Sequence, residues 1–205
     1  MTEALALLTL AGAFLIAAMS PGPNFVVVTA HALAARRCGL WTACGLMCGS
    51  TTWAAATVLG LNLLLAQAPW LYDSVRIAGA AYLIYLGLKM LWGLRRNGTP
   101  PVEKVPEVSA ATAWRRGYLT SLTNPKSAAF FASLFLATLP PQPAPWLLAA
   151  AVAVVCVLSA FWHFALALAF SHARVRALHA RARRVIDAVV GATLVLLGAR
   201  LLASR

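Results

Sequence analysis

One uncharged stretch constrains this chain more than any other feature: no Asp, Glu, Lys or Arg occurs from Ser127 to Ala173. A helix of about 20 apolar residues is enough to cross the roughly 30 Å hydrocarbon core of a bilayer. The stretch is too long for one such helix, and four prolines between residues 140 and 145 divide it. It therefore predicts two membrane spans, at about 117–139 and about 146–170.

Composition indicates the same class of protein for the whole chain. Hydrophobic residues make up 61% of the chain, charged residues 11%, and the mean hydropathy is +0.79. A soluble domain carries about 25% charged and about 45–50% apolar residues. A soluble fold of this size could not cover itself with polar atoms, and disorder or a disulfide scaffold is excluded by the same figures. The chain is predicted to be an all-α integral membrane protein.

The remaining uncharged runs predict four more spans, and thus six transmembrane helices in one transporter domain over residues 1–205. A first three-helix repeat covers 1–94, a polar cytoplasmic loop 95–116, and a second three-helix repeat 117–205. A shift of 102 residues takes Pro23 to Pro125. Because each half has an odd number of spans, the halves insert in opposite directions, as in transporters built from inverted repeats.

The net charge of +12 is explained by topology. Most of the 17 Lys and Arg residues fall in three alternate connections between the predicted spans. Basic residues near span ends stay in the cytoplasm. This predicts a multi-pass membrane protein with both termini outside, and it argues against nucleic acid as a partner.

Proline breaks the predicted first and fourth helices at corresponding places. In hydrocarbon, irregular backbone survives only where it faces protein or a wet cavity. The amide end of a half-helix suits a carboxylate and the carbonyl end suits an ammonium, so a zwitterionic amino acid offers both groups. A simple proline kink capped by Ser and Thr is the alternative for either break alone. The candidate substrate-binding residues at the two breaks are Pro21, Gly22, Pro23, Asn24, Asn124, Pro125 and Lys126.

Lys126 is the most informative single residue. It lies about 13 Å into its predicted span by helical rise, where a lysine is costly and usually faces the interior of the bundle. There it would meet the substrate carboxylate, with Asn24 and Asn124 beside it. The alternative is a side chain that snorkels to the interface.

Few other residues carry chemistry at depth. Asp187 is expected at the cytoplasmic end of the last span, so no acidic residue is expected inside the hydrocarbon. His163 is the remaining titratable group there, either as a proton relay or as a packing residue. The four cysteines form no C-x-x-C pair, so neither a metal nor a cofactor is expected. Glycines at helical spacings indicate close helix packing, within one protomer or between two, and are compatible with a homodimer.

Three motifs occur in order along the chain: residues 20–24 (Ser-Pro-Gly-Pro-Asn), the Gly- and Tyr-containing segment 79–87, and Asn124-Pro125-Lys126. They resemble the signatures of LysE-type amino-acid exporters, in particular the homoserine/threonine efflux (RhtB-type) branch. The resemblance implies an inner-membrane exporter driven by the proton gradient. Some relatives carry an acid where this chain has Asn24, Leu46 and Leu158, so the residue that couples transport to protons is left open.

The sequence as a whole predicts a secondary transporter, an antiporter that exports small neutral amino acids such as threonine or homoserine by alternating access. Its expected partners are the amino acid and the lipid bilayer. Two alternatives are an intramembrane enzyme using Ser20 and His163, and a passive channel for small polar solutes. The chain has no Gly-x-Ser-x-Gly elbow, and its spans show no continuous polar stripe.

Overall fold

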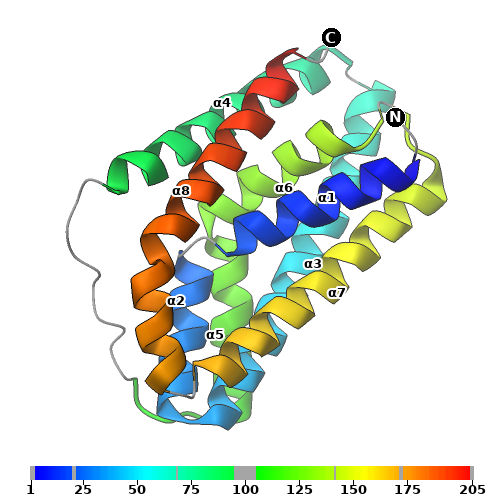
Figure 1. Cartoon of the computed structure of the whole chain (residues 1–205). Helices are drawn as coiled ribbons and strands as arrows, with labels where there is room; N and C mark the ends of the chain where they lie inside the picture. Colours follow the sequence, from blue (N-terminus) through cyan, green and yellow to red (C-terminus); the bar gives the residue numbers. More distant parts are fainter. Residues whose placement is uncertain are drawn as a thin grey trace.

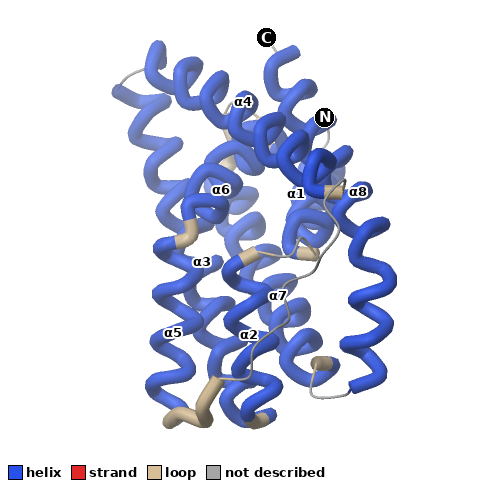
Figure 2. Tube along the Cα trace, turned by 90° about the vertical axis from the view of Figure 1, so that its left-hand side faces the viewer, coloured by secondary structure: helices blue, strands red, loops and turns tan. Residues whose placement is uncertain are grey.

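The computed structural model describes residues 3–19, 22–67, 69–94, 105–140, 142–170 and 173–203, and helices account for all regular secondary structure in these ranges (Figures 1 and 2). In chain order the helices are α1 (Glu3–Ala18), α2 (Pro23–Ala34), α3 (Arg36–Gln67), α4 (Pro69–Gly93), α5 (Ala110–Thr123), α6 (Pro125–Thr138), α7 (Pro145–Ala169) and α8 (Ala173–Ala203). The prediction of an all-helical chain is confirmed for this part of the sequence.

Both helix interruptions predicted from proline are present. The axes of α1 and α2 meet at 60°, and α2 begins at Pro23 after Gly22, whose backbone is extended. Asn124 is the single non-helical residue between α5 and α6, and α6 begins at Pro125. Proline suits the first position of a helix because its missing N–H would have no intrahelical acceptor there. Pro21 lies outside the described residues.

Several helices extend beyond the apolar runs. α3 begins at Arg36, α8 begins at Ala173 instead of near residue 185, and α5 begins at Ala110, inside the segment predicted as a loop. Ser109 caps α5, because its hydroxyl accepts a hydrogen bond of 3.3 Å from the backbone N–H of Thr112. Arg and Ala are strong helix formers, so hydropathy marks the hydrocarbon-spanning part of a helix and not its end.

The exterior is apolar and the interior holds hydroxyl groups. Leu8, Leu59 and Phe161 are 70%, 65% and 67% exposed. By contrast, Thr42 and Thr138 are fully buried, and each hydroxyl donates to the carbonyl four residues earlier in its own helix. This bond satisfies the hydroxyl without water. A surface of this kind fits a lipid environment.

Two helices are, by length and composition, able to cross a membrane on their own: α7 and the part of α8 from Arg184 to Ala203. The bent pair of α1 and α2 would make a third among the described residues. α1 begins and α8 ends at the same end of the molecule (Figure 1).

Close packing at glycines occurs within the chain. α3 packs along α5 and α7, and α4 packs along α8. A methyl group at Gly45 would collide with the carbonyl oxygen of Trp114 on α5, and one at Gly117 with that of Thr42 on α3. One at Gly87 would lie 2.5 Å from the carbonyl oxygen of Gly191 on α8. These glycines therefore allow the backbones of neighbouring helices within one chain to approach each other closely.

Candidate functional site

The two helix breaks meet through their asparagines. The side-chain N–H of Asn124 donates a 3.1 Å hydrogen bond to the amide oxygen of Asn24, in the first turn of α2. The Asn124 amide oxygen also caps α6 by accepting a 3.0 Å hydrogen bond from the backbone N–H of Lys126. The amino-terminal ends of α2 and α6, which carry partial positive charge, are therefore held beside each other.

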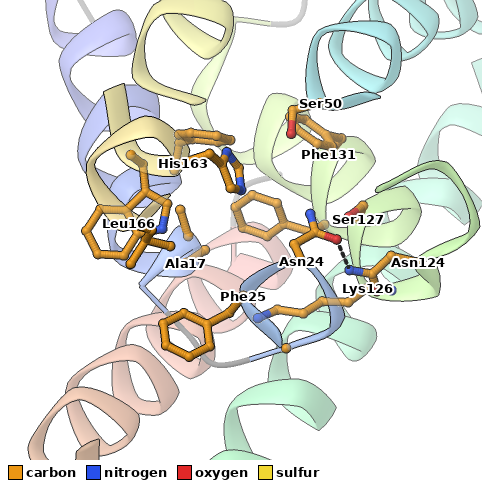
Figure 3. A pocket seen from close by; sticks show the side chains of 15 residues that line it. Ala17, Asn24, Phe25, Ser50, Asn124, Lys126, Ser127, Phe131, His163 and Leu166 are labelled. Atoms are coloured by element: carbon orange, nitrogen blue, oxygen red, sulfur yellow. Dashed lines mark hydrogen bonds between the residues drawn. The ribbon is translucent and has the colours of Figure 1, made fainter. Parts of the chain in front are cut away.

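A pocket lies at this junction (Figure 3). Its volume is about 60 Å³, counted as the space open to the centre of a water molecule. One water needs about 10–15 Å³ on that scale, so the pocket has room for about four to six water-sized groups. The polar lining consists of Gly22, Asn24, Ser50, Asn124, Lys126, Ser127, Trp162 and His163, and aromatic rings of Phe14, Phe25, Phe130 and Phe131 form much of the rest.

Lys126, the candidate residue for the substrate carboxylate, is the second residue of α6. Its side chain lines the pocket and reaches from α6 toward Phe25 on α2 (Figure 3). The side chain is partly buried. A cation in such a position needs either a counter-ion or a negatively charged ligand.

Asp187 lies in the first turn of the apolar part of α8, Arg184–Ala203, as expected for the end of the last span. Because α8 itself begins at Ala173, Asp187 is also near the middle of the whole helix. Its Oδ1 atom is buried, and its carboxylate acts electrostatically on the Lys126 ammonium. α6 and α8 are in contact, which brings the two charges into one neighbourhood. A carboxylate thus lies in the helical interior near the pocket.

His163 lines the same pocket and is 5% exposed. Its Nδ1 atom lies 2.8 Å from the backbone oxygen of Ser159 and 3.1 Å from the Ser159 hydroxyl. A carbonyl oxygen only accepts, so Nδ1 carries the proton and Nε2 is left as an acceptor. This geometry is compatible with either role predicted for His163.

Comparison with known proteins identifies the family. The sequence model of the LysE type translocator matches residues 15–205, nearly the whole chain. The chain belongs to this family. It is therefore a membrane translocator and not an enzyme.

This LysE-type chain is 33% identical to the uncharacterized membrane protein YahN of Escherichia coli (strain K12) over 196 residues, 93% of this chain and 86% of that protein. It is 30% identical to the threonine efflux protein of the same organism over 204 residues, 97% and 98% of the two chains. The threonine efflux protein of Salmonella typhi is 29% identical over 204 residues, 96% and 97% of the two chains. No solved structure matches the chain.

The translocator's pocket brings together most of the residues singled out from sequence. Gly22, Asn24, Asn124, Lys126 and His163 all line it, whereas Pro23 and Pro125 begin the two helices that point into it. Within the described residues, no three His, Cys, Asp or Glu side chains gather as they would around a metal ion.

Trp162 is the residue of this LysE-type pocket that sequence reasoning missed. Its indole Nε1 is buried and has no hydrogen-bond partner among the described residues. A buried donor without an acceptor costs free energy, so a partner supplied by a ligand would be favourable. Trp162 lies well inside the predicted span 146–170, and no local sequence pattern marks its N–H as a donor to a ligand.

Proposed function

We propose that this chain exports small neutral amino acids, threonine- or homoserine-like, across the inner membrane. The hydrogen bond between Asn124 and Asn24 carries the proposal, since it joins two helix breaks beside a lysine that lines the same pocket. Similarity to threonine efflux proteins supports the substrate class.

The carboxylate of the substrate binds at the cationic side of the pocket. Lys126 supplies a charge, and Trp162 supplies an N–H donor. Gly22 gives α2 no side-chain cap, so the positive end of that helix faces the ligand. The substrate ammonium binds the amide oxygens of the asparagines and nearby backbone carbonyls. A hydroxyl side chain finds partners in Ser50 and Ser127, which line the same pocket.

Alternating access follows from two related halves. The pair α1–α2 and the pair α5–α6 are taken as the broken first and fourth of six spans, arranged as inverted repeats with both termini outside. In this relation α3 corresponds to α7 and α4 corresponds to α8. Helix packing supports it, because the contact of α3 with α5 has its counterpart in the contact of α7 with α1, and α4 packs on its own counterpart α8. The two halves rock around the pocket and open it to one side at a time.

The charge of Lys126 is balanced in turn by two carboxylates. Asp187 acts on the Lys126 ammonium when no substrate is bound. The arriving substrate carboxylate takes over this role while the pocket is open to the cytoplasm. After the substrate leaves to the outside, Asp187 takes up a proton from that face and releases it when the pocket opens to the cytoplasm again. His163, on the opposite wall, relays that proton through its Nε2 atom. Export of the amino acid is thereby exchanged for inward proton movement.

The decisive experiment is amino-acid flux in proteoliposomes with an imposed pH gradient. Radiolabelled threonine should move against its concentration gradient, and collapse of the pH gradient should abolish the uphill movement. Flux that only follows the threonine gradient would identify a passive channel. The variant His163→Gln tests the proton relay. It should still exchange substrate when no pH gradient is imposed, but its gradient-driven flux should be reduced. Equal uphill flux in this variant would assign His163 to packing.

A further inference from the structure

A second recess lies on the surface of the molecule and shares no lining residue with the central pocket. It is formed by the first turns of α3 together with one aromatic side chain of α7. Its lining residues are Arg36, Arg37, Leu40, Trp41, Cys44 and Phe164. Arg36 and Arg37 are exposed, Trp41 is 41% exposed, and Leu40 and Phe164 are half-buried.

The residues of this recess form an ordered stripe along α3. Arg37 and Trp41 are four residues apart, as are Arg36 and Leu40, and both rows continue to Cys44. Residues at these spacings share one helix face. Arg36 and Cys44 are about 12 Å apart along the axis by helical rise. The face is thus cationic at the end of the helix and apolar for the next two turns.

The cationic end is reinforced by neighbouring groups. α3 begins at Arg36, so its first amides have no intrahelical acceptor and its positive end points the same way as the guanidinium groups. The Cys38 thiol donates to the carbonyl oxygen of Val108 at 3.2 Å, which holds the chain before α5 against this end of α3. The exposed Arg115 and Arg116 on α5 add to the positive field.

We infer that this recess binds one anionic phospholipid. The phosphate lies between Arg36 and Arg37, and one acyl chain lies along Leu40, Trp41 and Cys44 against Phe164. A soluble phosphate would need only the cationic end, whereas the apolar continuation fits a ligand with an attached hydrocarbon chain. Charge complementarity favours a negatively charged headgroup over a zwitterionic one.

Native mass spectrometry of the full chain in detergent tests this site. The protein is titrated with phosphatidylglycerol, with phosphatidylcholine of the same acyl chains, and with glycerol 3-phosphate. Phosphatidylglycerol should be retained as a single tightly bound copy, and the other two should bind far more weakly. The double variant Arg36→Gln/Arg37→Gln should bind phosphatidylglycerol about thirtyfold more weakly, since each basic residue near an anionic headgroup contributes roughly a fivefold factor.

The matched control removes the same charge elsewhere. Lys89→Gln/Arg200→Gln alters two exposed basic residues outside the recess and should retain the bound lipid. Equal loss in both double variants would show non-specific attraction and overturn the site. Equal retention of phosphatidylcholine, or equally tight binding of glycerol 3-phosphate, would overturn it as well. The lipid comparison on the unmodified chain keeps the test valid if a variant folds poorly.

Discussion

The side chains of Asn24 and Asn124, 100 residues apart in sequence, are joined by a 3.1 Å hydrogen bond at the centre of the molecule. Asn24 is the second residue of α2, and Asn124 is the N-cap residue that precedes α6. The bond therefore fixes the relative position of two broken helices. It also orients the amide oxygen of Asn124 toward the backbone N–H of Lys126, so one side chain links both breaks to the lysine.

Replacing Asn124 should separate its two roles. Asn124→Ala loses the cap of α6 as well as the bond to Asn24, so we expect about 1 kcal/mol lower stability and strongly reduced export. Asn124→Ser keeps a capping oxygen and should recover stability but not export. Thermal unfolding and threonine efflux measure the two effects. Recovery of full export in the serine variant would contradict a transport role for the bond.

Lys126→Met should abolish export while the protein still inserts and folds. The methionine keeps an unbranched apolar chain and removes the charge that binds the substrate carboxylate. Charge-assisted hydrogen bonds contribute about 1.5–3 kcal/mol, so substrate affinity should fall at least about tenfold. Lys89→Met is the control, because Lys89 is exposed and its Nζ lies 5.7 Å from the Tyr85 ring centre. Equal efflux from both variants would remove Lys126 from the site.

Asp187→Asn should uncouple exchange from the proton gradient. The variant keeps the shape of the side chain and removes the carboxylate that competes with substrate for the Lys126 ammonium. We expect tighter threonine binding, retained counterflow and loss of uphill export. Binding and flux in the same proteoliposome preparation check this. Weaker binding together with normal gradient-driven export would refute the exchange of carboxylates.

Trp162→Phe should weaken substrate binding without disturbing the fold. The substitution keeps a six-membered aromatic ring and removes the five-membered ring that carries the buried N–H. A hydrogen bond to a charged group is worth about 1.5–3 kcal/mol, so KM should rise about tenfold or more. Trp92→Phe is a suitable control, because Trp92 is 71% exposed. An unchanged KM in Trp162→Phe would mean that the N–H has no role in binding.

Gly87→Ala should destabilise the contact between α4 and α8. The added methyl group would lie 2.5 Å from the Gly191 carbonyl oxygen and 2.7 Å from a Val195 methyl carbon. Overpacking of this kind costs about 1–3 kcal/mol, which lowers Tm by roughly 2–10 °C in a chain of this size. Gly60→Ala, where no atom lies within 4 Å, should leave Tm unchanged or higher. A similar decrease of Tm in both variants would mean that the decrease comes from replacing a glycine as such, and not from the contact between α4 and α8.

The sequence alone determined the membrane class and the positions of both helix breaks. Hydropathy follows directly from composition. Proline interrupts a helix because it has no backbone N–H to donate and its ring clashes with the preceding turn, so both signals are local. The predicted last span matches the apolar part of α8, Arg184–Ala203. The same local reasoning did not find where the helices α5 and α8 begin, because capping and strong helix formers extend helices past the apolar run.

Tertiary structure decided which side chains share the pocket. The bond between Asn24 and Asn124, the approach of Asp187 to Lys126, and the burial of the Trp162 N–H each depend on how separate helices pack. Glycines set how closely those helices approach, and no local pattern specifies which backbone faces which. Residues distant in the chain become one binding site only when this packing fixes their distances, since electrostatic and hydrogen-bond energies depend on distance and burial.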